Sequence, residues 1–201
     1  MKNRLIGFRK ILMYFYIISL FISCKREQIK NEKVELLENI VKVNLGRKLV
    51  IPKDLQLYTP FSQNSTDSAK IANSSLKLYS YVNTSCSTCL DEIKEWNSFA
   101  LKLKKYKTPI ILVCKTRDNF ELLKYLCETK KIKTFDYPFF LDIKEHYINK
   151  NPFMNASSDF ETVLTDRNNS ILLIGNPLHS EIIKQLYLSK IQKDQGEVKI
   201  Q

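Results

Sequence analysis

The sequence from Leu78 to Trp96 reads LYSYVNTSCSTCLDEIKEW. An apolar run leads into a short polar turn, then into Cys86 and Cys89 at positions i and i+3, then into a pattern with helical period. A cysteine at the start of a helix lies near unpaired backbone N–H groups and the positive end of the helix dipole, which both favour the thiolate over the thiol. Because the thiolate is the reactive form, this stretch predicts a thiol–disulfide exchange site.

The two cysteines are expected to have different roles. Cys86 lies nearer the turn and is the candidate nucleophile, whereas Cys89 is the candidate resolving thiol, which attacks the mixed disulfide formed at Cys86. A static disulfide and one half of a metal site are the alternatives. A disulfide that closes so short a loop gives little entropic stabilisation, which disfavours the first alternative. His146 and His179 have no metal-ligand spacing to the cysteines, which disfavours the second.

Residues 1–23 have the pattern of a signal peptide. A basic segment without acidic residues precedes an apolar run over 11–22, which is shorter than the roughly 20 residues that span a membrane. The run ends at Ser23-Cys24, directly before charged residues. This junction resembles a bacterial lipobox, which implies cleavage before Cys24 and lipidation of its sulfur. An ordinary signal peptide or an uncleaved anchor with an incidental cysteine is the alternative.

The composition favours a folded, exported domain. The chain has 201 residues, of which 44% are hydrophobic and only four are glycine, so it is neither disordered nor fibrous. Removing the four positive charges of Lys2, Arg4, Arg9 and Lys10 from the net charge of +11 leaves +7. The remaining lysines are scattered among acids without a nucleic-acid motif, so no nucleic-acid partner is expected.

The chain after the leader divides into a tether and one domain. Residues 24–45 read as a charged tether that enters a short amphipathic segment, residues 46–192 as an α/β domain with its core over 70–192, and residues 193–201 as a polar tail. Apolar patterns predict strands over 76–82, 109–114 and 138–142, with a helix after each of the first two.

The last part of the domain reads as a β-hairpin and a helix. The hairpin is predicted over 161–165 and 170–175, and Asn176-Pro177 predicts the start of the final helix. The apolar face of that helix is predicted from five residues, namely Ile182, Ile183, Leu186, Tyr187 and Ile191.

This order of elements, with Cys-x-x-Cys at the end of the first crossover strand, resembles the thioredoxin-like superfamily. The closest resemblance is to the membrane-tethered TlpA/ResA-type thiol–disulfide oxidoreductases, which are often exported lipoproteins. It implies a three-layer α/β fold with a central mixed β-sheet flanked by helices. It also implies a redox pair of Cys86 and Cys89 that needs no cofactor or metal, protein thiols and disulfides as substrates, and a partner protein that exchanges electrons. The expected location is the cell envelope, facing the periplasm or at the outer membrane.

The sequence differs from the family pattern in three features. Ser85 replaces the residue, often Trp, before the first cysteine, and Ser87 and Thr88 stand where proline is common. The segment 158–161 lacks the cis-proline that precedes the hairpin strand in the family and helps to hold extended substrates. A cis bond before any other residue costs about 3 kcal/mol, so a trans segment is expected here. The rival interpretation is therefore a non-catalytic lipoprotein that uses the fold as a binding or scaffold module.

Several other residues of interest are predicted to be structural. Cys114 and Cys127 are expected to be buried thiols, with a second disulfide between them as the alternative. Trp96 is expected in the core. Glu92 and Glu95 are expected to face solvent, and His179 to be exposed and inert. In thioredoxin-like proteins a buried acid beneath the site can transfer a proton to the resolving thiol, so a catalytic role for Glu92 or Glu95 is the alternative that the resemblance implies.

Overall fold

The computed structural model describes residues 32–61, 71–85, 87–132, 135 and 137–198, with the backbone alone for 87–90 and 195–198. The chain divides into two units, Met1–Val43 and Asn44–Gln201. A helix covers residues 32–44, and its exposed side chains include Val34 and Leu36. The second unit contains the sheet and every other element described below.

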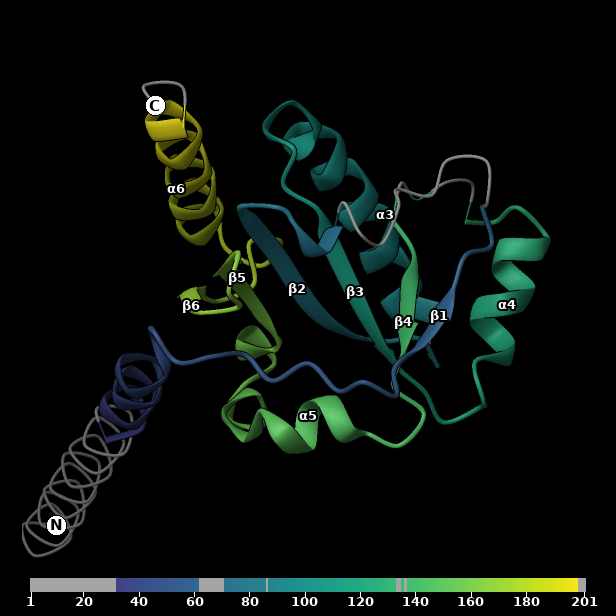
Figure 1. The fold of residues 1–201 in the computed structure, drawn as a ribbon. Coiled ribbons are helices and arrows are strands. Elements are labelled where there is room, and N and C mark those ends of the chain that lie inside the picture. Colours follow the sequence, from purple (N-terminus) through teal and green to yellow (C-terminus); the bar gives the residue numbers. More distant parts are fainter. Residues whose placement is uncertain (1–31, 62–70, 86, 133–134, 136, 199–201) are drawn as a thin grey trace, which may run out of the picture. The chain divides into compact units, whose positions relative to one another are not determined.

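Six strands form one mixed sheet in the order β1-β4-β3-β2-β5-β6 (Figure 1). Its strands are β1 (Gln56–Tyr58), β2 (Leu76–Asn83), β3 (Ile110–Lys115), β4 (Phe139–Leu141), β5 (Thr162–Asp166) and β6 (Ile171–Ile174). β3 pairs in parallel with β2 and with β4, whereas β5 is antiparallel to β2 and β6, and β1 is antiparallel to β4. The predicted parallel pair and the predicted hairpin are therefore confirmed.

Helices and short 3-10 segments lie between the strands and after the last of them. The helices are α3 (Ser87–Leu103), α4 (Glu121–Glu128), α5 (His146–Lys150) and α6 (Glu181–Val198). The 3-10 segments are η1 (Lys104–Tyr106), η2 (Pro152–Ala156) and η3 (Ser158–Glu161). Among the helices of the described residues, none is long and apolar enough to cross a membrane.

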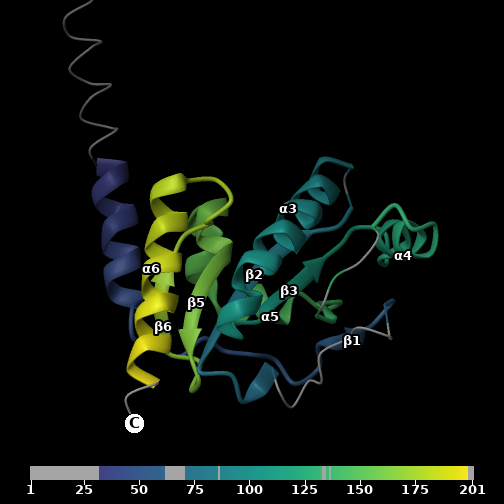
Figure 2. The same cartoon turned by 90° about the horizontal axis from the view of Figure 1, so that it is seen from above.

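Both faces of the sheet are covered, because neighbouring residues of a strand point to opposite faces. Leu78 and Val82 of β2 belong to the core cluster that also holds buried residues of α3, α4 and α6. Tyr81, between them in alternation, faces the other side and packs against Tyr147 of α5, with the ring centroids 5.6 Å apart. Figure 2 shows these elements from above. The three-layer α/β arrangement with a mixed central sheet confirms the predicted fold class.

Helix α3 buries one face against this core. Ile93, Trp96, Ala100 and Leu103 recur at intervals of three or four residues, which places them on one side of a helix. All four are buried, and Trp96 has no exposed surface. The core position predicted for Trp96 is confirmed.

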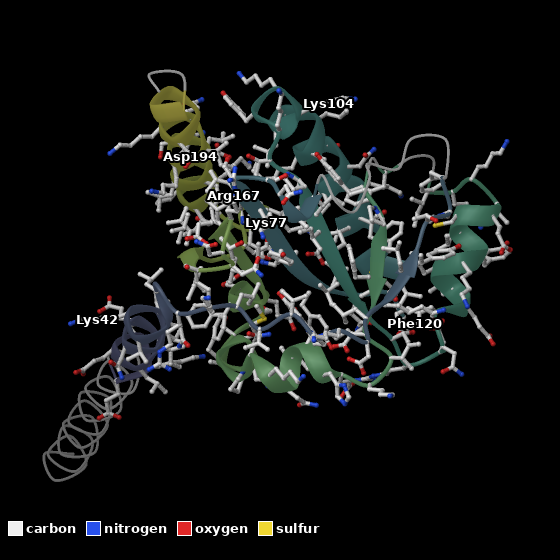
Figure 3. All side chains as sticks on the ribbon, viewed as in Figure 1. Lys42, Lys77, Lys104, Phe120, Arg167 and Asp194 are labelled. Atoms are coloured by element: carbon white, nitrogen blue, oxygen red, sulfur yellow. The ribbon has the colours of Figure 1, made fainter. Side chains whose placement is uncertain are left out.

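Two contacts hold the hairpin side of the sheet. The backbone N–H of Gly46 donates to the carbonyl of Ile171 at 2.8 Å, so the segment that begins the second unit lies along β6 and covers its edge. On β2, the buried Lys77 donates from Nζ to the carbonyl of Arg167 at 2.9 Å (Figure 3). Lys77 thus satisfies a backbone acceptor in the β5–β6 turn.

The last helix begins later than the sequence predicts. Asn176 does not start α6, because its side-chain oxygen accepts from Leu178 N at 2.9 Å and closes a turn. The helix begins at Glu181 after Ser180, and it continues beyond Gln192 to Val198. The predicted apolar face is correspondingly wrong in part. Tyr187 and Ile191 are buried, but Ile182 is 76% exposed and Leu186 is also exposed, because they lie to the side of the buried row.

Candidate functional site

The predicted cysteine pair lies where the central strand β2 passes into α3. β2 ends at Asn83 and α3 begins at Ser87, so the Cys-x-x-Cys motif stands at the carboxyl end of a parallel strand. The backbone of Cys89 belongs to the first turn of α3. Cys86 and the predicted lipidation site Cys24 lie outside the described residues, so the roles assigned to these three cysteines stay predictions.

Hydrogen bonds fix the two residues that precede Cys86. Thr84 is fully buried, and its backbone N–H and its hydroxyl both donate to the carbonyl of Lys115, at 2.9 and 3.0 Å. Ser85 N donates to the side-chain oxygen of Asn83 at 2.9 Å, which closes a local turn. These bonds fix where the chain leaves the sheet and turns toward α3.

The loop after β3 contacts this turn from the other side. The hydroxyl of Ser85 accepts from Arg117 N at 2.6 Å and lies 3.2 Å from the hydroxyl of Thr116. Thr116 in turn bonds to the carboxylate of Asp118, which also accepts from Leu122 N in the first turn of α4. Ser85, where the family often has tryptophan, therefore acts as a hydrogen-bonded link between two loops.

The sequence predicts that Glu92 faces solvent, and this prediction is wrong. It is half-buried on α3, and its Oε1 accepts from the indole Nε1 of Trp96 at 3.2 Å. Burial raises the pKa of this carboxyl, and the hydrogen bond from Trp96 opposes that rise. Glu95 is exposed, as predicted.

Glu92 belongs to a chain of polar contacts that leads away from α3. Asn176, which is buried, places Nδ2 at 3.5 Å from Glu92 Oε1 and at 3.3 Å from Nε2 of His179. His179 Nδ1 lies 2.8 Å from the carboxylate of Asp159. Gly175, at φ +139, adopts a conformation that other residues rarely take, and this lets the chain leave β6 and turn into Asn176.

His179 is half-exposed, as its position near the helix start indicates, but it is not isolated. Its connection to Glu92 was not predicted from the sequence. The one local signal is the spacing of Glu92 and Trp96, which allows an i, i+4 hydrogen bond. No local sequence pattern indicates that Asn176, His179 and Asp159 lie near Glu92.

A short 3-10 segment stands where the family places its cis-proline. In η3, Phe160 is buried and Glu161 directly precedes β5. Every peptide bond between described residues is trans, as expected for this segment. Glu161 Oε1 lies 2.7 Å from Lys115 Nζ, and that ammonium lies 4.8 Å from the ring centroid of Tyr81. An ion pair therefore stands at the start of β5, beside the end of β3.

Cys114 and Cys127 are free, buried thiols, which confirms the predicted core positions. Burial raises the pKa of Cys114 strongly and that of Cys127 to about 12. Both groups therefore stay protonated near neutral pH and are poor nucleophiles. The alternative disulfide between them is not formed.

Within the described part of the chain, no group of three or more His, Cys, Asp or Glu side chains is arranged to hold a metal ion.

No protein-family model matches the sequence, and no curated protein is similar enough to count as a relative. Solved structures do match. A candidate thiol:disulfide interchange protein, DsbE, from Chlorobium tepidum aligns at 17% identity with a TM-score of 0.50, over 73% of this chain and 97% of that one. A thioredoxin-like protein in its oxidised form aligns at 12% identity over 78% of this chain and 98% of that one, with a TM-score of 0.49.

A third similar structure is the thioredoxin domain of a thiol-disulfide oxidoreductase from Bacteroides vulgatus. It aligns at 16% identity with a TM-score of 0.42, over 70% of this chain and 96% of that one. At such identities a likeness shows the fold alone. The likeness to the Chlorobium tepidum structure, together with the sheet order, shows that this chain has a thioredoxin-like fold.

Proposed function

We propose that this protein is a thiol–disulfide oxidoreductase of the cell envelope, held to a membrane by lipid on Cys24. The observation that carries the proposal is the place of the motif. α3 begins directly after Cys86, at the carboxyl end of the central strand β2, and Glu92 lies half-buried on the same helix. The description of the Chlorobium tepidum structure as a candidate interchange protein supports the same chemistry.

The exchange has two steps. The Cys86 thiolate attacks one sulfur of a substrate disulfide, so a mixed disulfide forms and the other substrate sulfur leaves as a thiolate that takes a proton. Cys89, deprotonated, then attacks the sulfur of Cys86. The substrate leaves as a dithiol, and the pair becomes a disulfide that has given up two electrons. Run backwards, the same steps oxidise a dithiol substrate, and a partner protein restores the pair.

Glu92 suits the second step. The resolving thiol must lose its proton before it attacks, and a carboxylate three residues further along the helix is within the reach of a general base. A raised pKa brings the proton affinity of the carboxyl closer to that of a thiol, which helps it to take and to return a proton.

A second candidate function rests on η3. The ion pair between Lys115 and Glu161 occupies the segment where the family's proline helps to hold extended substrates. A charged pair there is consistent with a different way of docking, and it favours a non-catalytic binding module as the alternative. Such a module predicts a cysteine pair that does not react with substrates.

The experiment that separates the two functions traps the intermediate. Cys89→Ser removes the resolving attack, so mixed disulfides between Cys86 and substrate proteins should accumulate in envelope extracts. Cys86→Ser should trap few of them, and Cys127→Ser, a buried thiol off the site, should trap no more than the wild type. Equal trapping in the two motif variants, or none in either, would contradict the proposed function.

A further inference from the structure

Asn176 has one orientation only. The backbone N–H of Leu178 lies 2.9 Å from one side-chain atom of Asn176 and can only donate, so that atom is the oxygen Oδ1. The other atom is therefore Nδ2, which carries two protons. These protons are directed at Glu92 Oε1 on α3 and at His179 Nε2 near the start of α6, at 3.5 and 3.3 Å.

This orientation selects one tautomer of a neutral His179 ring. Its Nε2 faces the donor Nδ2 of Asn176, so Nε2 must accept and carry no proton. Its Nδ1 faces the carboxylate of Asp159 at 2.8 Å and must donate. In a neutral imidazole, the arrangement therefore places the single ring proton on Nδ1. A second proton on Nε2 would bring two donors together.

We propose that His179 and Asp159 are positioning residues, which hold Asn176 against Glu92 and couple the charge of His179 to the environment of that carboxyl. Histidine is the side chain that ordinarily changes charge between about pH 5 and 8. When His179 is neutral, Asn176 is held by His179 and by Leu178 N. When His179 gains a proton, it repels the Asn176 amide and places a positive charge near Glu92.

Within the described part of the chain, the groups that face this chain of contacts come from α3, η3, the end of β3 and the segment before α6. Glu92 is faced by Trp96 on its own helix, by Asn176 and His179 from the segment before α6, and by the charge of Glu161 from η3, which Lys115 pairs. His179 is faced by Asp159 and Asn176. The positive charge of a protonated His179 lowers the pKa of Glu92, against the larger effect of burial.

The consequence for catalysis rests on the proposed function. If Glu92 accepts the proton of Cys89, the rate of the second exchange step depends on the charge of His179. Acid conditions in the envelope would then change the rate through the charge of His179.

Trp96 can report the state of Glu92, and His146 offers a matched control for His179. Trp96 is the only tryptophan, and its indole N–H donates to Glu92, so its single indole NMR signal reports the state of that carboxyl. His146 is the only other histidine, and its Nδ1 also lies 2.8 Å from an aspartate, Asp54. His146 is on α5 and shares no contact with Glu92, so His146→Gln is a matched control.

The test follows the Trp96 indole signal of the reduced full chain from pH 4 to 9. The wild type and His146→Gln should show two steps, one from Glu92 and one from His179. His179→Gln should keep the Glu92 step, because the glutamine oxygen still accepts from Asn176, but should lose the other step. His179→Ala, which has no acceptor, should also speed solvent exchange of the Asn176 side-chain amide, whereas His179→Gln should not.

Two results would overturn the proposal: an unchanged titration in His179→Gln, or the same change in His146→Gln. The test does not depend on exchange activity. A cysteine pair that fails to trap substrates, together with a lost His179 step, would refute the proposed function and support the positioning role. Trapped substrates, together with an unchanged titration in His179→Gln, would support the proposed function and refute the positioning role.

Discussion

At the scale of single residues, Ser85 joins the turn before Cys86 to the loop after β3. Its hydroxyl bonds to Arg117 N and to the hydroxyl of Thr116. Ser85→Ala should lower the free energy of unfolding by about 1–2 kcal/mol, because two hydrogen bonds are lost, and urea denaturation measures this. The control is Ser98→Ala on the exposed face of α3, where the hydroxyl bonds only to a carbonyl of its own helix. Equal losses in the two variants would contradict the linking role of Ser85.

Glu92 gives a second prediction at this scale, through the pH dependence of stability. Burial raises the pKa of its carboxyl in the folded state, so the native protein holds this proton to higher pH than the unfolded chain does. Its contribution to stability is therefore fully present below the ordinary range for glutamate and is lost as pH rises through the folded-state pKa. Glu92→Gln removes this loss.

Glu92→Gln should therefore be more stable than the wild type at pH 7, and the difference should shrink toward pH 4. Urea denaturation at both pH values tests this. Glu95→Gln, on the exposed side of the same helix, should show no such pH-dependent difference. A Glu92→Gln curve that stays parallel to the wild-type curve would show that the carboxyl is well solvated.

At the scale of elements, the pairing of β2 with β5 places the hairpin and the segment before α6 beside α3. Ser80 and Thr162 are buried on these two strands, and their hydroxyl oxygens lie 2.8 Å apart. Either single change, Ser80→Ala or Thr162→Val, leaves one buried hydroxyl without this partner and should cost about 1–3 kcal/mol. The double variant should cost less than the sum of the two, as a double-mutant cycle would measure. Strict additivity would show that the two hydroxyls do not depend on each other.

The elements could be predicted from the sequence because their apolar residues recur with clear periods. The continuous apolar run before Cys114 predicted a parallel strand that is covered on both faces. Apolar residues at intervals of three or four predicted the helix α3. The start of α6 could not be predicted in the same way. Asn-Pro is common at helix starts, but here the Asn176 side chain closes a turn of its own and delays the helix until Glu181.

The candidate site was predictable only in its local part. The cysteine motif is a signal within a few residues, so it is visible in the sequence. The contacts from Glu92 to Asp159 join α3, η3 and the segment before α6, which meet only after β5 has paired with β2 and β6 has paired with β5. No local pattern marks such a meeting. This is why Glu92 was wrongly expected to face solvent and why the partners of His179 were missed.

At the scale of the whole molecule, the Ser23-Cys24 junction predicts how the protein is anchored. The chain expressed in a bacterium that makes lipoproteins should take up labelled fatty acid and should partition into detergent. Cys24→Ser should lose both properties, because its hydroxyl replaces the sulfur that carries the lipid. Ser23→Ala, which keeps a small residue before the cysteine, should retain both. Unchanged labelling of Cys24→Ser would refute the lipoprotein interpretation.

The most direct test of the proposed chemistry is a redox titration of the purified protein in glutathione buffers. Alkylation with a mass label, followed by peptide mapping, gives the fraction of each cysteine that is reduced. Cys86 and Cys89 should change together in a two-electron transition, with a midpoint above the value of about −300 mV below which structural disulfides lie. Cys114 and Cys127 should stay reduced and react only after unfolding. A Cys86–Cys89 pair that remains oxidised across all the buffers, or that never forms a disulfide, would contradict thiol–disulfide exchange at this site.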